Sequence, residues 1–229
     1  MAEKRSYVRA MFARIAPRYD LMNRLMTLGR DQVWRRRAAH LALGSNAPAP
    51  RFLDLATGTG DLARVLLQLK HHAQVVGLDL TFEMLLGARA KNLYSIQFIN
   101  GDALELPFPN DTFDGITSAF MLRNVVDLAR SFEEMVRVAK PNARIVALEI
   151  TQPRLPVWRE LYSFYFYRVV PILGGIISGD MQAYRYLPQS VSRFVSPQEL
   201  ATVMTHAGVR ELQYQLLNLG TIAIHFGMK

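Results

Sequence analysis

The sequence contains no cysteine, and its five histidines are scattered. The lack of cysteine excludes disulfides, thiolate metal sites and every mechanism with a cysteine nucleophile. The one adjacent pair, His71 and His72, is more typical of a solvated turn than of a ligand pair, so we expect no metal site. With 229 residues, half of them hydrophobic, the chain is long enough for one substantial core, and we expect a single domain.

A long apolar run free of charge is also missing. The longest apolar stretch, residues 158–177, is interrupted by Arg159, Glu160, Arg168 and Pro171. A spanning helix of about 20 apolar residues tolerates few such residues, so we expect no transmembrane segment. The first fifteen residues mix charged with apolar positions and show no secretory signal, which favours a cytoplasmic protein.

Acidic residues are rare at the N-terminal end. Residues 1–50 hold 10 of the 27 Lys and Arg but only 3 of the 19 Asp and Glu, so most of the net charge of +8 belongs to this segment. A basic arm of this kind favours an anionic partner, either nucleic acid or the cytoplasmic face of a membrane. A solvated helix face that keeps the protein soluble is the simpler alternative.

Hydrophobic periodicity predicts the elements. Val8, Met11, Phe12 and Ile15 lie on one face of a basic amphipathic helix that ends before Pro17. We expect strands at 52–55, 75–78, 96–99, 113–119, 144–150, 211–217 and 221–227, and helices at 19–26, 31–43, 62–69, 82–90 (capped by Thr81), 128–139 and 197–206, the last opened by a capping box of Ser196 and Glu199.

This alternation predicts an α/β fold with a doubly wound, mostly parallel sheet of seven strands that ends in an antiparallel hairpin. Within one domain, 1–229, we expect a helical cap at 1–50 with a linker at 44–50, a nucleoside-binding core at 51–150, an inserted helical lid at 151–190 and a C-terminal helix and hairpin at 191–229.

A glycine-rich turn follows the first predicted strand, in the run from Asp54 to Asp61, and Asp79 ends the next strand. Dinucleotides, flavins and S-adenosylmethionine all bind at such turns. Asp61 within the turn would repel a pyrophosphate and could attract the ammonium group of an amino acid. The turn therefore favours S-adenosylmethionine.

Three landmarks, the run 54–61, Asp79 and the segment 101–103, resemble the motifs of class I S-adenosylmethionine-dependent methyltransferases, which have a Rossmann-like fold. Asp79 could instead cap the next helix, and Asp102 could be an ordinary turn residue. The resemblance implies a set of cofactor-binding residues, which are Asp54, Thr57, Gly58, Thr59, Gly60, Asp61, Asp79, Leu80, Asp102, Ala103 and Ala119.

Further segments resemble the UbiE/COQ5 family of quinone-biosynthesis C-methyltransferases, and they are 12–23, 106–114, 122–125, 184–190 and 225–229. The chain departs from the family at Ala119, where we expect Ser in many members, although Ser118 is adjacent. Met121 stands where Gly is usual, and Asn142 with Ala143 replaces a Gly-Gly turn. Asn tolerates the left-handed conformation that such a turn needs.

Methylation of a ring carbon requires an electron-rich carbon in line with the sulfonium methyl, and a quinol provides one when a hydroxyl loses its proton. We expect Arg123 to stabilise the developing oxyanion or to polarise a bridging water, and Asn124 to orient Arg123. Tyr19 is the candidate to close over the ring and to assist the proton transfer. The alternatives are an ordinary surface pair for Arg123 and Asn124 and core packing for Tyr19.

The aromatic and apolar lid segment, residues 158–177, is suited to line a channel for a polyprenyl tail, or to dock on a membrane or a partner subunit. Core packing would explain part of it. Together with the basic N-terminal helix it predicts peripheral contact with the inner face of the cytoplasmic membrane, and a homodimer is a further expectation.

The stretch 162–174 resembles menaquinone-pathway members of the family, which implies conversion of demethylmenaquinol to menaquinol. The alternatives are the ubiquinone-pathway reaction on 2-polyprenyl-6-methoxy-1,4-benzoquinol, RNA methylation, and a non-enzymatic assembly factor. Against RNA methylation, cysteine is absent and no Pro-Pro-Tyr or Pro-Pro-Phe follows the fourth predicted strand, so we expect no nucleic-acid partner.

Overall fold

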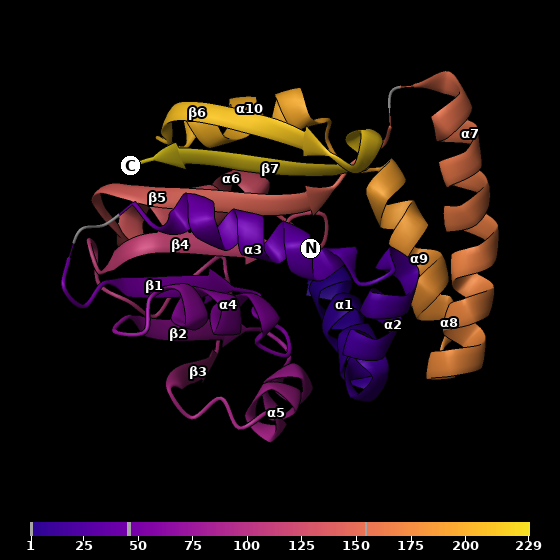
Figure 1. Ribbon diagram of the computed structural model, residues 1–229, viewed down its shortest axis with the longest axis horizontal. Coiled ribbons are helices and arrows are strands. Elements are labelled where there is room, and N and C mark those ends of the chain that lie inside the picture. Colours follow the sequence, from indigo (N-terminus) through magenta and orange to yellow (C-terminus); the bar gives the residue numbers. More distant parts are fainter. Residues whose placement is uncertain (1, 45–46, 154) are drawn as a thin grey trace.

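The computed structural model describes residues 2–44, 47–153 and 155–229, so positions 45 and 46 of the predicted linker and position 154 of the predicted lid lie outside the described residues. Seven strands form one sheet in the order β3-β2-β1-β4-β5-β7-β6. They are β1 (Arg51–Leu55), β2 (Gln74–Asp79), β3 (Ile96–Asn100), β4 (Phe113–Ala119), β5 (Ala139–Ile150), β6 (Arg210–Leu217) and β7 (Ile222–Met228). The first five strands are parallel and β7 is antiparallel to both neighbours, which confirms the predicted fold class (Figure 1).

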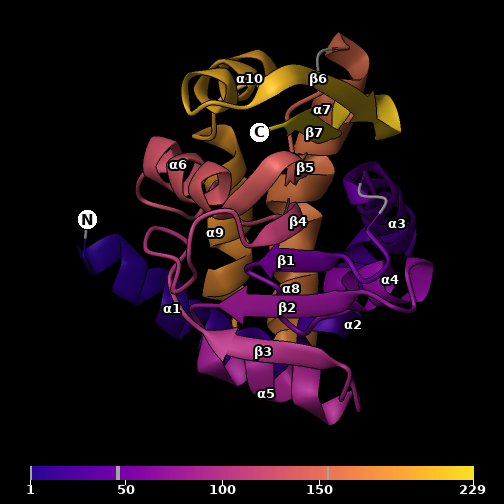
Figure 2. The ribbon, with the colours of Figure 1, turned by 90° about the vertical axis from the view of Figure 1, so that its left-hand side faces the viewer.

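Helices surround the sheet. They are α1 (Ala2–Ile15), α2 (Tyr19–Thr27), α3 (Arg30–Ala42), α4 (Asp61–Leu69), α5 (Phe82–Ala90), α6 (Leu128–Val138), α7 (Pro156–Phe164), α8 (Val170–Ser178), α9 (Met181–Ser192) and α10 (Pro197–His206). Figure 2 shows α6 and α10 on one side of the sheet and α3 and α4 on the other. The predicted capping box at the start of α10 is present, with Ser196 and Glu199 bonded reciprocally.

Alternation along the strands divides the core into two layers. Leu53 and Leu55 of β1 pack with the residues under α6 and α10, whereas Phe52 packs with those under α3 and α4. A third cluster joins the cap to the lid, because Met11 and Met22 pack with Phe166, Val170 and Tyr184, among others. The cap and the lid therefore form one wall at the carboxyl end of the parallel strands (Figure 1).

Two local predictions are wrong. The strand predicted from Arg144 begins at Ala139, because Phe113 of β4 pairs with Ala139 and the register then shifts, so that Gly115 pairs with Arg144. Residues 140–143 of β5 therefore have no paired residue in β4, as in a β-bulge. Asn142, one of them, has the predicted left-handed conformation (φ 64°). At the start of α5, Thr81 is the N-cap residue but its side chain makes no capping bond.

The lid begins with one continuous helical segment, Pro156–Ser178, of 23 residues. Between α7 and α8 it contains a π-helical turn, Tyr165–Val169, just before Pro171, whose missing N–H interrupts the regular hydrogen-bond ladder. By length and composition alone this segment could cross a membrane. In the structure, α8 and the π-helical turn of this segment pack on α9. That the segment does not span a membrane remains a prediction.

Candidate active site

A small cavity of about 110 Å³ lies where the strand order changes direction, beside the carboxyl ends of β1, β2 and β4. Ligands of open α/β sheets bind at this kind of position. Of the predicted cofactor-binding residues, the structure brings six to this cavity: Gly58, Asp79, Leu80, Asp102, Ala103 and Ala119. The neighbouring Ser118 is buried in the sheet, so of the two it is Ala119 that lines the cavity.

Asp79 ends β2 with both carboxylate oxygens bonded to backbone. It accepts hydrogen bonds of 2.8 Å from the N–H groups of Gly58 and Thr81. Asp79 therefore stabilises the start of α5, in line with the alternative that it caps this helix. It also lines the cavity. Burial raises the pKa of this carboxyl, and the two backbone bonds oppose the shift.

The Asp79 acceptor and the apolar walls of the small cavity fit parts of an adenosine. The Asp79 carboxylate is an acceptor suited to ribose hydroxyls, and Leu80, Ala103 and Met121 offer apolar surface for a base. Drug-sized ligands occupy cavities of roughly 300 Å³ or more, so the present volume is small for a whole nucleoside. A segment of the helical cap also lines this cavity.

That segment is helix α1. Arg5 pairs with Asp102 at 2.8 Å, Lys4 donates a 2.9 Å bond to the carbonyl of Val125, and Val8 and Phe12 line the cavity from above. Part of the basic surplus of the N-terminal segment is thus directed at the protein itself, over the cofactor cavity.

Five predicted cofactor residues do not line either of the two main cavities of the described chain: Asp54, Thr57, Thr59, Gly60 and Asp61. Asp54 is fully buried and accepts bonds from the hydroxyls of Thr57 (2.7 Å) and Thr117 (2.8 Å), which tie the turn to β4. Burial raises the pKa of Asp54 to about 6, and the two hydroxyl bonds limit the shift. Its contribution is to the shape of the turn.

Asp61 already has a cation, which bears on its predicted attraction for an ammonium group. Its carboxylate lies 2.7 Å from the Lys91 ammonium and 3.2 Å from the side-chain amide of Gln32. Lys91 also contacts Asp20 at 2.6 Å, and Asp20 accepts a 2.5 Å bond from Thr59. Our reading of the sequence missed Lys91 and Asp20, because no local pattern links them to the turn.

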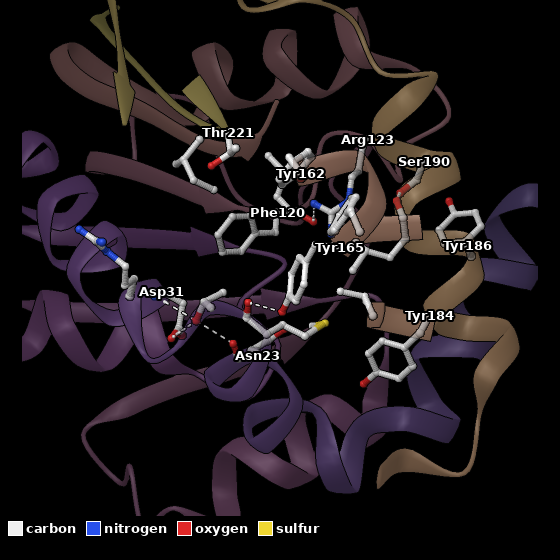
Figure 3. A pocket seen from close by; sticks show the side chains of 18 of the residues that line it. Asn23, Asp31, Phe120, Arg123, Tyr162, Tyr165, Tyr184, Tyr186, Ser190 and Thr221 are labelled. Atoms are coloured by element: carbon white, nitrogen blue, oxygen red, sulfur yellow. Dashed lines mark hydrogen bonds between the residues drawn. The ribbon is translucent and has the colours of Figure 1, made fainter. Parts of the chain in front are cut away.

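A second cavity of about 530 Å³ lies between the sheet and the lid. Its walls come from the cap, the lid and α9 and are rich in aromatic side chains, as Figure 3 shows for Phe120, Tyr162 and Tyr165. Phe12, Tyr19, Phe120 and Asn124 line this cavity and the small one. The two cavities therefore meet at these four side chains, and Tyr19 is placed at the junction.

Arg123 follows β4 and is almost completely buried, which rules out an ordinary surface position. Its Nη1 donates to the carbonyl of Phe120 (2.8 Å) and to Glu149 (2.9 Å). Its Nε has no hydrogen-bond partner among the described residues, and the side chain lines the large cavity (Figure 3). The guanidinium is thus fixed at one end and retains donor capacity at the other.

Asn124 is held in a different way from our prediction, because it shares an acceptor with Arg123 and has no direct bond to it. Its Nδ2 donates to the Phe120 carbonyl at 3.3 Å, and its Oδ1 accepts from the Tyr186 hydroxyl at 3.2 Å. Phe120 has a left-handed backbone (φ 63°). Tyr186 and Glu149 are further residues that sequence reasoning missed, and only the segment 184–190 gave a signal for either.

Half-buried tyrosines line the large cavity. Burial raises the pKa of Tyr162, with the Arg123 charge opposing the shift, and burial likewise raises the pKa of Tyr186 and Tyr165. Tyr165 donates a 2.9 Å bond to the carbonyl of Met26. At neutral pH these phenols are neutral donors, and Arg123 and Arg30 are the cations that line the cavity with them.

Comparison with known proteins agrees with this geometry. The model of the ubiE/COQ5 methyltransferase family matches residues 1–229. The demethylmenaquinone methyltransferase of Thermus thermophilus is 48% identical over 95% of this chain and 99% of its own, and that of a Roseiflexus species (strain RS-1) is 44% identical over 99% and 95%. The ubiquinone/menaquinone biosynthesis C-methyltransferase UbiE of Geobacter sulfurreducens is 40% identical over 100% and 91%.

Among solved structures, an S-adenosylmethionine-dependent methyltransferase from Thermotoga maritima superimposes with a TM-score of 0.69 at 19% identity, over 96% of this chain and 99% of that one. Another, from Aquifex aeolicus, gives 0.63 at 19% identity over 91% and 97%. These two likenesses show the fold.

Proposed function

The chain belongs to the ubiE/COQ5 methyltransferase family, and we propose that it transfers the methyl group of S-adenosylmethionine to a ring carbon of demethylmenaquinol, forming menaquinol. The observation that carries this proposal is the junction of the small cavity beside Asp79 with a large aromatic cavity, at Phe12, Tyr19, Phe120 and Asn124. Relatives named demethylmenaquinone methyltransferase support the choice of quinol.

The reaction forms one carbon–carbon bond. When bound, S-adenosylmethionine supplies an electrophilic methyl group on a sulfonium. The quinol loses a hydroxyl proton to solvent, and the electron pair of the adjacent ring carbon bonds to the methyl carbon as the bond to sulfur breaks and its electron pair stays on sulfur. The ring carbon then loses its own proton and the quinol oxygen takes one up, which restores the aromatic quinol with one more methyl group and releases one proton overall.

The side chains at the junction take distinct roles. The guanidinium of Arg123 is a cation, so it stabilises the quinol oxygen as negative charge develops there. Asn124 and Tyr186 form a hydrogen-bonded pair that orients the ring at the same edge of the cavity. Tyr19 covers Gly58 from the cap and limits the water that reaches the junction.

RNA methylation has less support from the structure. Four cations of the N-terminal segment already have partners within the chain: Lys4 with the Val125 carbonyl, Arg5 with Asp102, Arg14 with Asp180, and Arg18 with the Ile177 carbonyl. They leave less charge for phosphates, and the large cavity offers mainly apolar walls to a substrate.

The test is direct. The purified protein is incubated with methyl-labelled S-adenosylmethionine and reduced demethylmenaquinone, with the ubiquinone-pathway quinol and total RNA as parallel substrates. We expect labelled menaquinol as the main product. If no quinol is labelled by protein that binds S-adenosylmethionine, the proposed function is wrong and the assembly-factor alternative stands.

We also propose that the rim of the large cavity contacts the cytoplasmic face of the membrane. Leu28 at the end of α2 and Leu161 in α7 line the cavity and are 89% and 58% exposed. Further exposed apolar residues lie on α2 and in the lid, namely Leu21, Leu25, Val157, Phe164, Ile172 and Ile176. A polyprenyl tail that leaves the cavity between Leu28 and Leu161 would pass directly into lipid, and exposed Arg24 and Arg159 would face anionic headgroups.

Vesicle sedimentation tests this contact. We expect the protein to sediment with vesicles that contain phosphatidylglycerol more than with pure phosphatidylcholine, and Leu28→Ser with Leu161→Ser to reduce the bound fraction several-fold. Tyr94→Ser is the matched control, because Tyr94 is 88% exposed and lies away from the cavity rim. If light scattering shows a dimer in the wild type and a monomer in the double variant, without vesicle binding, the rim is a subunit interface instead.

A further inference from the structure

Glu149 is a buried carboxylate on β5 that faces the residues following β4. Its Oε2 lies 2.9 Å from Nη1 of Arg123, and its Oε1 accepts a 2.6 Å bond from the backbone N–H of Leu122. The side chain is only 2% exposed. One carboxylate thus fixes both the backbone and the side chain of the segment that carries Arg123.

We propose that Glu149 is a positioning residue for Arg123, and that its negative charge sets the pH at which the bound quinol loses its proton. The inference rests on the proposed function, since it concerns the same reaction. It assigns a role to a residue that does not itself line either of the two main cavities of the described chain.

The geometry restricts how Arg123 can point. Glu149 and the Phe120 carbonyl together occupy Nη1, while Nε is left without a partner among the described residues. The guanidinium also lies 5.9 Å from the Phe120 ring, at the junction of the cavities. Without the carboxylate, a single carbonyl would hold Arg123, and a buried cation would have no counter-charge.

The charges around Arg123 determine the direction of the effect. Tyr162 from the lid and Tyr186 from α9 face it and are neutral, Arg193 lies near Tyr186, and Arg35 of α3 lies 5.2 Å from the Phe120 ring. Glu149 is therefore the negative group next to Arg123, and the pair carries no net charge. Burial raises the pKa of Glu149, but Arg123 opposes the shift and favours the carboxylate.

Removing the negative charge leaves Arg123 uncompensated. A quinolate beside it would then be stabilised more than in the wild type. At the effective dielectric constant of about 20 that suits protein interiors, one charge several ångströms away shifts an ionisation by on the order of one pH unit. Glu149→Gln keeps an acceptor for Leu122 and removes the charge, but its amide nitrogen cannot accept a bond from Arg123. Comparison with Glu149→Asp, which keeps the charge, separates the effect of the charge from that of this bond.

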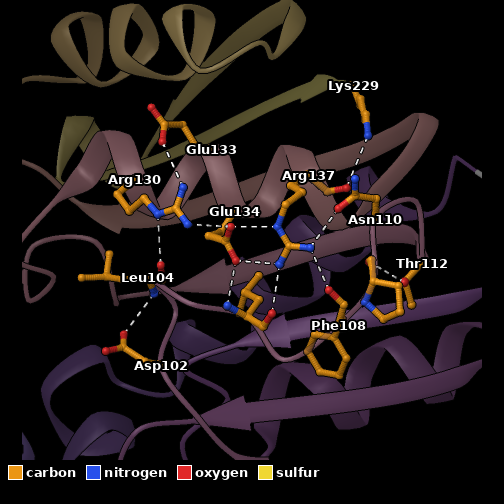
Figure 4. A network of polar contacts seen from close by, with 12 residues as sticks. Asp102, Leu104, Phe108, Asn110, Thr112, Arg130, Glu133, Glu134, Arg137 and Lys229 are labelled. Carbon is orange, nitrogen blue, oxygen red and sulfur yellow. Dashed lines mark hydrogen bonds and ion pairs between the residues drawn. The ribbon is translucent and has the colours of Figure 1, made fainter.

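The chain offers a matched control in Glu134 of α6. This carboxylate is also 3% exposed at its side chain, bonds the N–H of Leu106 at 2.8 Å and holds Arg137 at 2.7 Å and Arg130 at 3.1 Å (Figure 4). Neither of the two main cavities is lined by it. Glu134→Gln therefore reports the general cost of neutralising a buried carboxylate that is bonded to arginine.

The experiment measures kcat against pH with demethylmenaquinol and saturating S-adenosylmethionine. We expect the acid limb for Glu149→Gln to move about one unit to lower pH. In Glu149→Asp the charge is kept but the shorter side chain reaches Arg123 poorly, so the limb should stay in place while kcat falls at least tenfold. Glu134→Gln should leave both quantities unchanged.

A second readout needs no turnover. The ultraviolet spectrum of demethylmenaquinol bound with S-adenosylhomocysteine, titrated under anaerobic conditions, should show quinolate at lower pH in Glu149→Gln. An unchanged limb and an unchanged spectrum would overturn the proposal and leave Glu149 a structural residue. If Glu149→Gln does not fold, a wild-type kcat in Glu149→Asp would overturn it equally. A wild type that binds the quinol but forms no product would refute the proposed function instead.

Discussion

The hydroxyl of Thr59, in the glycine-rich turn, donates a 2.5 Å hydrogen bond to the carboxylate of Asp20, in the helical cap. Lys91 reinforces this connection, because its ammonium lies 2.6 Å from Asp20 and 2.7 Å from Asp61 of the same turn. Tyr19, next to Asp20 in the chain, covers Gly58 and lines both cavities. The position of Tyr19 is thus coupled to the turn that shapes the cofactor site.

Asp20→Ala should loosen the cap. The Kd for S-adenosylmethionine should rise about tenfold, since losing a charge-assisted contact of this kind costs on the order of 1.5–3 kcal/mol, part of which appears in binding. Calorimetric titration measures this change. Asp180→Ala is the control, because the ion pair of Asp180 with Arg14 also holds the cap but does not involve the glycine-rich turn. Equal affinities in the two variants would contradict the coupling.

Arg123→Ala should abolish most methyl transfer and leave S-adenosylmethionine binding intact. Removing one donor that stabilises a developing oxyanion costs about 10²–10³ in kcat in other enzymes. Arg123→Lys should recover little, because a lysine ammonium cannot contact Glu149 and the Phe120 carbonyl while also presenting a planar donor to the cavity. Single-turnover rates and calorimetry separate the two effects. If the variant lost cofactor binding, Arg123 would instead contribute to the small cavity that binds S-adenosylmethionine.

The parts of the site that could be predicted are those with a local signal. The turn after β1 and the acid at the end of β2 are marked by glycines and strand ends within a few residues, and strand periodicity predicts the order of elements. Asp20, Lys91 and Glu149 carry no such signal, because their partners lie 39, 30 and 26 residues away along the chain. Only packing of the cap, of α5 and of β5 brings them to the site.

Asp54 lies in the glycine-rich motif, but in the structure its carboxylate binds two threonine hydroxyls and does not line the cofactor cavity. It lies opposite Thr117 in the parallel pairing of β1 and β4, so its carboxylate meets a hydroxyl that is 63 residues distant. Neither the glycines nor the residue spacing of the turn indicates that contact. The same holds for the bulge in β5, which depends on where Phe113 pairs.

The raised pKa of Asp54 makes a prediction about stability against pH. A carboxyl whose pKa is about 6 in the folded state and near 3.8 when unfolded stabilises the fold while protonated, and this contribution is lost as pH rises from about 4 through 6. The full effect is about 3 kcal/mol, on the scale of 1.36 kcal/mol per pKa unit. Asp54→Asn cannot ionise. Relative to the wild type, its free energy of unfolding should therefore rise between pH 4 and 6 and level off above pH 7.

Urea unfolding at each pH measures this difference. Asn keeps one acceptor for a threonine hydroxyl, and the other hydroxyl can rotate to accept from the amide, so the contacts with Thr57 and Thr117 are retained. A difference between variant and wild type that does not depend on pH would show that Asp54 is ionised in the folded protein as readily as in the unfolded chain.

Gly174 and Gly175, neighbours in α8, should respond very differently to alanine. A Cβ at Gly174 would lie 2.2 Å from the ring of Tyr184 in α9, whereas one at Gly175 would meet the flexible end of Met181 at 3.1 Å. Gly174→Ala must therefore push α8 away from α9 and widen or collapse the wall of the large cavity, at a cost of about 1–3 kcal/mol for overpacking. Gly175→Ala should cost less, and the higher helix propensity of alanine should offset part of that cost.

The consequence for function separates the two cavities. Gly174→Ala should raise KM for demethylmenaquinol at least tenfold and leave the Kd for S-adenosylmethionine unchanged, because Tyr184 lines the large cavity and not the small one. Gly175→Ala should keep both constants near their wild-type values. Thermal unfolding, initial rates and calorimetry on the two variants test this together. If both alanines weaken quinol binding equally, the α8 and α9 contact at Tyr184 does not shape the quinol site.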